Sequence, residues 1–123
     1  MTEATTRAVF AGTTWRLWVA PLVWAAHFLA IYAFTALACE RNIATEGWFG
    51  VGIVTWFIAA TTLAAVTVLL VTIGLAVRDG ARAHSSPTPS AFIHWLTAAL
   101  AGLVLLAVLW ETLLPVLLVP VCG

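Results

Sequence analysis

The stretch from Leu17 to Ala38 constrains the fold more than any other part of the chain, because its 22 residues carry no formal charge. At about 1.5 Å per residue, a helix of this length extends about 33 Å, enough to cross a hydrocarbon core of about 30 Å. A helix also satisfies its own backbone polar groups where no water is present. The stretch therefore predicts a membrane-spanning helix at about residues 16–38.

Two further uncharged stretches predict two more spans. Gly47–Val77 has no charge over 31 residues, and this length exceeds the bilayer. Because its first residues are rich in glycine, we expect the helix to begin near Gly50 and to span about residues 51–77. A loop rich in proline and serine follows, and the third span is expected at about residues 91–114, where Pro115 disturbs the helix.

Composition agrees with this class of fold. The 123 residues are 63% hydrophobic and only 8% charged, whereas a soluble domain has about a quarter of its residues charged. We therefore predict an all-α integral membrane protein with three transmembrane helices, forming a single membrane domain over residues 1–123. The chain has no run of basic residues, so the composition excludes nucleic acid as a partner.

The arginines predict the orientation. Arg7 and Arg16 flank the first span, and Arg78 and Arg82 lie in the second loop. Only Arg41 lies in the loop between the first two spans. Because basic residues concentrate in cytoplasmic segments, we expect the N-terminus in the cytoplasm and the C-terminus in the periplasm, with the protein in a bacterial inner membrane.

The two cysteines predict a disulfide. Cys39 follows the first span and Cys122 follows the third, so the expected topology puts both on the outer side of the membrane. That compartment is oxidising, and thiols there do not persist unpaired. The tail need only return toward the first span for the two alpha carbons to come within disulfide distance.

Small residues spaced one turn apart predict close helix packing, because they let two backbones approach each other. Such pairs lie in the second and third spans: Ala60 with Ala64, Thr61 with Ala65, and Ala98 with Gly102.

Three polar residues inside the spans are expected to be buried: His27, Tyr32 and Glu111. A carboxylate in hydrocarbon costs several kcal/mol unless it is paired or protonated. Glu111 lies about 16 Å from Cys122 along a helix and His27 about 18 Å from Cys39, so the two have similar depths. We therefore expect a hydrogen bond to Glu111 from Tyr32, from His27 or from a partner chain.

His27 is the one candidate cofactor-binding residue. Its functional interpretation is haem or metal ligation, or proton relay. Its alternative is a neutral histidine hydrogen-bonded to a neighbouring helix or subunit. His94 differs from it in depth by roughly 20 Å, so one haem could not bridge the two. No metal site is predicted, since the sequence has no clustered His/Cys set.

The pattern W-R-x-W-x-x-P-x-x-W-A-x-H-F at Trp15–Phe28, followed by Tyr32 and Ala38-Cys39, resembles a known group. These are small three-span membrane proteins of proteobacteria encoded beside haem-copper (cytochrome c) oxidase genes. The resemblance covers mainly the first third of the chain. It implies an accessory subunit or assembly partner of a terminal oxidase, with any haem held in the partner complex.

The residues themselves contain no complete catalytic site, since the chain offers no nucleophile–base pair and no phosphate-binding loop. We therefore expect a non-catalytic subunit whose partners are larger membrane-protein subunits and the lipid bilayer, with no cofactor bound by this chain alone. Two alternatives stay open. One is a small homo-oligomeric proton-coupled transporter that uses Glu111, and the other is a haem or copper handling factor that uses His27, Cys39 and Cys122.

Overall fold

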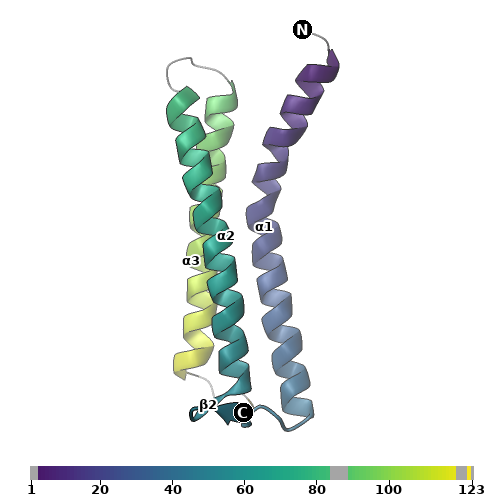
Figure 1. Ribbon diagram of the computed structural model, residues 1–123, viewed down its shortest axis with the longest axis vertical. Helices are drawn as coiled ribbons and strands as arrows, with labels where there is room; N and C mark the ends of the chain where they lie inside the picture. Colours follow the sequence, from purple (N-terminus) through teal and green to yellow (C-terminus); the bar gives the residue numbers. More distant parts are fainter. Residues whose placement is uncertain (1–2, 84–88, 119–121, 123) are drawn as a thin grey trace.

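The computed structural model is an all-α bundle of three helices (Figure 1). The helices are α1 (Glu3–Glu40), α2 (Ile53–Ala83) and α3 (Pro89–Leu118). The structure describes residues 3–83, 89–118 and 122. The predicted fold class is therefore confirmed, and the three predicted spans correspond to the three long helices.

All three helices are long and apolar enough to cross a membrane. Their outward faces carry large aliphatic side chains: Leu29, Leu63 and Leu106 are 63%, 69% and 69% exposed. Water disfavours such a surface, whereas lipid tails solvate it. The chain is therefore a membrane-embedded protein.

The helices cross the molecule in alternating directions, so the two ends of the chain lie at opposite ends of the bundle (Figure 1). α2 and α3 pack along each other, and α1 leans away from them toward its N-terminal end. The end that holds Cys39 also holds the segment joining α1 to α2. That end is consequently the more tightly connected of the two.

The buried core is a narrow strip of small and aliphatic residues. On α3, buried positions recur at intervals of four, three and four residues: Thr97, Ala101, Val104 and Val108. On α2 the intervals are four and seven: Val54, Ile58, Ala65, Leu69, Ala76 and Gly80. Each helix thus buries one thin face and leaves the rest of its surface to the surroundings.

α2 and α3 pack closely against each other at Gly80. A Cβ atom added there would lie 3.3 Å from the indole nitrogen of Trp95. Two of the predicted small-residue pairs lie on α2. The pair of Thr61 and Ala65 faces the core of the bundle, because Ala65 is buried and Thr61 is half-buried. Ala60 and Ala64 are exposed, so their predicted packing role within the chain is wrong.

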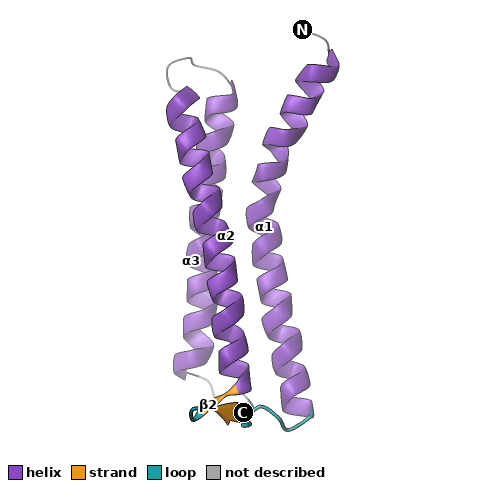
Figure 2. Cartoon of the chain, viewed as in Figure 1, coloured by secondary structure: helices purple, strands orange, loops and turns teal. Residues whose placement is uncertain are grey.

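A two-stranded β-hairpin precedes α2 (Figure 2). Strand β1 (Gly47–Trp48) pairs antiparallel with β2 (Val51–Gly52). Phe49 and Gly50 form the turn with φ values of 55° and 76°, and a two-residue turn with both φ values positive matches the right-handed twist of the strands. The prediction that α2 begins near Gly50 is therefore wrong, since the helix begins at Ile53.

The hairpin is fixed to the start of α2 by two hydrogen bonds. The backbone N–H of Ile53 donates to the carbonyl of Glu46 at 2.8 Å, and the indole N–H of Trp56 donates to the carbonyl of Trp48 at 3.3 Å. Trp48 and Phe49 are 79% and 89% exposed at the tip. Exposed aromatic side chains next to the start of a span are typical of the aromatic belt at a membrane surface.

Two helix ends differ from the predicted bounds. α1 begins at Glu3 rather than near residue 16, and α3 continues through Pro115 to Leu118. A proline inside a helix has no N–H for the carbonyl four residues earlier, which here is the carbonyl of Glu111. The helix nevertheless continues because neighbouring helices and side chains in a membrane tolerate such a break.

Candidate functional site: a polar cluster between the three helices

A chain of side-chain hydrogen bonds crosses the bundle from α1 to α3. It begins at His27, which is only 5% exposed. Its Nε2 atom lies 3.1 Å from the hydroxyl oxygen of Thr62 on α2, and that oxygen lies 3.1 Å from the hydroxyl oxygen of Thr112 on α3. The Thr112 hydroxyl donates at 2.8 Å to the carbonyl of Val108. One connected set of polar groups therefore joins all three helices.

The direction of each hydrogen bond follows from the number of protons. A threonine hydroxyl has a single proton to donate. Thr112 uses its proton on Val108, so its oxygen accepts from Thr62. Thr62 then has no proton left for His27, so its oxygen accepts from Nε2–H of the imidazole. This network assigns the histidine tautomer with the proton on Nε2.

A second interaction lies beside this chain of hydrogen bonds. The indole N–H of Trp24, three residues before His27 on α1, donates at 3.0 Å to Oε1 of Glu111 on α3. Glu111 is the neighbour of Thr112 and is half-buried. Its carboxyl group lies near enough to the imidazole of His27 to interact with it electrostatically. The two interactions thus belong to one polar cluster, which consists of Trp24, His27, Thr62, Glu111 and Thr112.

Two atoms of the polar cluster are buried without a hydrogen-bond partner among the described residues. They are Nδ1 of His27 and Oε2 of Glu111. Buried polar atoms in native proteins are almost always paired, so each such exception calls for an explanation. The cluster is therefore incomplete as a set of donors and acceptors.

The polar cluster matches the sequence-based expectations in part. His27 is buried, and it meets Glu111 at the depth that the two spans predict. The expected hydrogen bond to Glu111 exists, although Trp24 supplies it rather than Tyr32 or His27. A signal for this pairing was present in the sequence, because residues three apart lie on the same side of a helix.

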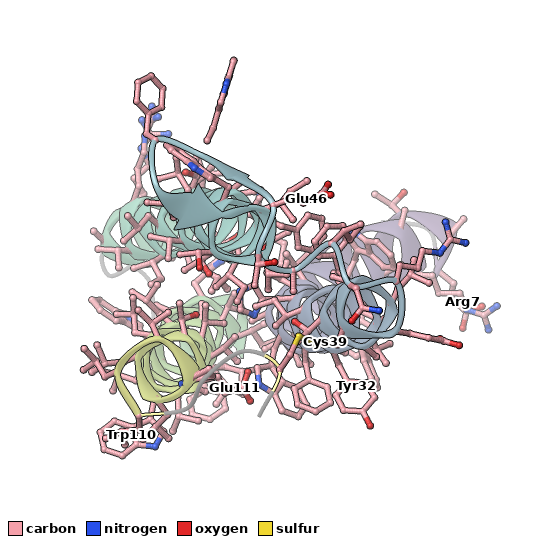
Figure 3. The ribbon with its side chains drawn as sticks, turned by 90° about the horizontal axis from the view of Figure 1, so that it is seen from below. Arg7, Tyr32, Cys39, Glu46, Trp110 and Glu111 are labelled. Carbon is pink, nitrogen blue, oxygen red and sulfur yellow. A yellow bond between two sulfur atoms is a disulfide. The ribbon has the colours of Figure 1, made fainter. Side chains whose placement is uncertain are left out.

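The prediction that Tyr32 is buried is wrong. Tyr32 is 70% exposed and lies on the outside of the bundle (Figure 3). Five residues separate it from His27, which is a rotation of about 140° around the helix. Its ring stacks on Phe28 and the ring of Phe28 stacks on Trp24, with 6.2 Å between centroids in each pair. These three aromatic residues form a ladder along the outer face of α1.

The predicted disulfide is confirmed. Cys39 and Cys122 are bonded, with 5.7 Å between their alpha carbons and 83 residues between them in the chain. Figure 3 shows the bond beside the end of α1. Neither thiol can ligate a metal ion while it is oxidised, so the donor set of the haem or copper handling alternative is reduced to His27. Within the described ranges, no three metal-ligating side chains come together.

Charged groups gather at the other end of the bundle. Arg16 on α1 and Asp79 on α2 form a salt bridge at 2.5 Å, with side chains 43% and 31% exposed. His94 acts electrostatically on Asp79, so it lies with this group. Arg16 is eleven residues before His27, about 16 Å along α1. The structure thus agrees with the expected separation of the two histidines.

The fold and the polar cluster define the chain as a small all-α membrane protein with three helices. No protein-family model matches the chain, and neither a curated protein nor a solved structure matches it. The resemblance to proteins encoded beside oxidase genes therefore stays a prediction.

Proposed function

We propose that the chain is a non-catalytic accessory subunit, or an assembly and stability factor, of a respiratory membrane complex, and that this complex is a haem-copper terminal oxidase. The sequence pattern from Trp15 to Cys39 supports the choice of complex. The single observation that supports a partner-binding role is the exposed hydroxyl of Tyr32 on the outer face of α1.

Tyr32 is an unusual residue to leave facing lipid. It lies seven residues before Cys39, about 10 Å from the end of the helix and so within the hydrocarbon. Side chains on a helix tilt toward its N-terminus, which directs Tyr32 away from the nearer membrane surface. Among the described residues its hydroxyl has no hydrogen-bond partner. A helix of a larger subunit, packed on the aromatic ladder, would supply the missing acceptor.

The proposed location is a bacterial inner membrane, with the N-terminus in the cytoplasm and the C-terminus in the periplasm. The positions of the arginines support this orientation, since Arg16 and Arg82 lie at one end of the bundle. The disulfide supports it independently, because the bond between Cys39 and Cys122 needs an oxidising compartment at the other end.

Affinity purification in a mild detergent tests this proposal. The tagged chain should bring large subunits with it, and the visible spectrum of the preparation should contain haem bands. Tyr32→Ala should reduce the amount of co-purified haem severalfold, because it removes both the hydroxyl and the last ring of the ladder. Leu63→Ala is the matched control, since Leu63 is 69% exposed on α2. Its co-purification should equal that of the wild type.

Other results would contradict the proposal in distinct ways. A colourless homo-oligomer would favour the proton-coupled transporter that uses Glu111. Haem or copper bound to the isolated chain would favour the handling factor. Equal losses in Tyr32→Ala and Leu63→Ala would show that the outer face of α1 is not the docking surface.

A further inference from the structure

The last turns of α2 carry more positive charge than the surrounding residues neutralise. Arg16 on α1 forms a salt bridge with Asp79, and Arg82 also lies near enough to Asp79 to interact with it electrostatically. One carboxylate therefore serves two guanidinium groups. Arg78 adds a third guanidinium group, and among the described residues it forms no ion pair. This end of the bundle is consequently left with an excess of positive charge.

Arg78 and Arg82 lie on one face of α2. They are four residues apart, so their side chains are neighbours on the surface of the helix, and both are exposed. Two like charges at this spacing repel each other and destabilise a helix. An anion bound between the two guanidinium groups removes the repulsion. The planar guanidinium group matches the geometry of a phosphate, to which it donates paired hydrogen bonds.

The same face of α2 continues as an aliphatic surface toward the middle of the helix. Val71 and Leu75 precede Arg78 by seven and three residues, a spacing that places all three on one side of a helix. Val71 and Leu75 are 56% and 45% exposed. These four residues form the α2 stripe: Val71, Leu75, Arg78 and Arg82. The α2 stripe changes from aliphatic to basic along the helix, as a phospholipid changes from acyl chain to charged head group.

The basic end of the α2 stripe lies at the depth of lipid head groups. Arg16, which is joined to Asp79 at this end, lies about 35 Å from Cys39 along α1, slightly more than a hydrocarbon core of about 30 Å. Trp15 and Trp18 flank Arg16 and are 64% and 59% exposed. Exposed indole groups gather where the hydrocarbon meets the head groups. A lipid phosphate is therefore the anion that the basic end of the stripe meets at this depth.

We propose that the α2 stripe binds one anionic phospholipid, with its phosphate between the guanidinium groups of Arg78 and Arg82 and an acyl chain along Val71 and Leu75. The bound phosphate offsets the repulsion between the two arginines, so the lipid stabilises the end of α2. The salt bridge of Arg16 with Asp79 holds α1 beside the site. This inference does not depend on the proposed subunit role.

Native mass spectrometry of the purified full-length chain in detergent tests the site. The probe is phosphatidylglycerol, compared with phosphatidylcholine, whose head group has no net charge. The wild type should bind phosphatidylglycerol more tightly. Arg78→Gln/Arg82→Gln should weaken this binding about 25-fold, since each arginine near an anionic lipid contributes about fivefold. The binding of phosphatidylcholine should not change. Circular dichroism and an intact disulfide verify that the variant folds.

The matched control is Arg7→Gln/Arg41→Gln, which removes the same charge from positions outside the α2 stripe. Arg7 lies at the edge of the bundle, away from α2 (Figure 3), and Arg41 follows the other end of α1. Its affinity for phosphatidylglycerol should equal that of the wild type. Equal losses in the two double variants would show that net charge alone attracts the lipid, and would overturn the site. A wild type without a preference for phosphatidylglycerol would also overturn it, and would favour an acidic segment of a partner protein as the occupant.

Two further measurements separate a lipid site from a phosphate site. Glycerol phosphate has the phosphate without acyl chains, so it should not displace phosphatidylglycerol from the wild type. Displacement would show that Val71 and Leu75 take no part, and would overturn the lipid as ligand. Phosphatidylglycerol should also raise the melting temperature of the wild type, because a ligand that binds only the folded state stabilises it. An equal rise in Arg78→Gln/Arg82→Gln would contradict the proposal.

Discussion

The indole nitrogen of Trp24 and Oε1 of Glu111 are joined by a 3.0 Å hydrogen bond across 87 residues of sequence. The bond links the first helix to the third beside the buried imidazole of His27. It places a large aromatic residue, usually a membrane-surface anchor, in a structural role at the depth of the only carboxyl group within the spans.

Removal of that donor should destabilise the bundle. Trp24→Phe keeps the ring that stacks on Phe28 but leaves Oε1 of Glu111 without its partner. We expect a loss of about 1 kcal/mol in the free energy of unfolding. Thermal unfolding in detergent micelles, followed by circular dichroism, measures it. Trp110→Phe is the control, because Trp110 is 64% exposed on the adjacent position, and an equal loss there would refute the prediction.

The hydroxyl of Thr62 should matter more than that of Thr67 on the same helix. Thr62 both accepts from His27 and donates to Thr112, whereas the exposed Thr67 donates only to the carbonyl of Leu63 in its own helix. Thr→Val preserves the shape of the side chain. We expect Thr62→Val to cost about 1 kcal/mol and Thr67→Val less than about 0.5 kcal/mol in unfolding experiments. A larger loss for Thr67→Val than for Thr62→Val would contradict the role of the Thr62 hydroxyl in linking His27 to Thr112.

The disulfide should be quantitative in protein isolated from the membrane. Alkylation after denaturation should modify no cysteine without reductant and both after reduction. The double variant Cys39→Ser/Cys122→Ser should lose about 2–4 kcal/mol of stability, because the bond closes a long loop in the unfolded chain. Two alkylated cysteines per unreduced chain would refute the bond and would weaken the orientation argument as well.

The orientation can be measured with reporter fusions. A reporter that is active only in the periplasm should be active when fused after Gly123, because four of the five arginines lie in the N-terminal part of α1 or in the last turns of α2. The same reporter inserted between α2 and α3, at residues 84–88, should be inactive. Activity of a cytoplasm-dependent reporter at the C-terminus would contradict this topology.

The three helices could be predicted from the sequence because a long uncharged segment has few other structures in a bilayer. The pairing of Cys39 with Cys122 followed from the same reasoning, since three spans bring both cysteines to one end. The hairpin could not be predicted in this way. Its turn contains Phe49 rather than the asparagine or aspartate that usually precedes glycine at such a turn, and so the signal was weak.

The direction in which each side chain points from its helix is the hardest feature to predict. A helix that is apolar all round has no hydrophobic face to fix its rotation about its axis. The polar hydroxyl of Tyr32 therefore favours the interior of the bundle, although the rotation of α1 that buries His27 turns Tyr32 outward. The pairing of Trp24 with Glu111 depends on the same rotation, which only the packed bundle determines.

The disulfide fixes α1 at one end, so a tilt of the helix displaces each residue in proportion to its distance from Cys39. The bond fixes the helix at Cys39, while the salt bridge of Arg16 with Asp79 holds it near the far end. Arg16 is about 35 Å from Cys39 along the helix, and His27 is about 18 Å from it. A tilt of about 5° would move Arg16 by about 3 Å and His27 by only about 1.5 Å on this geometry. A tilt that separates Arg16 from Asp79 therefore displaces His27 only about half as far.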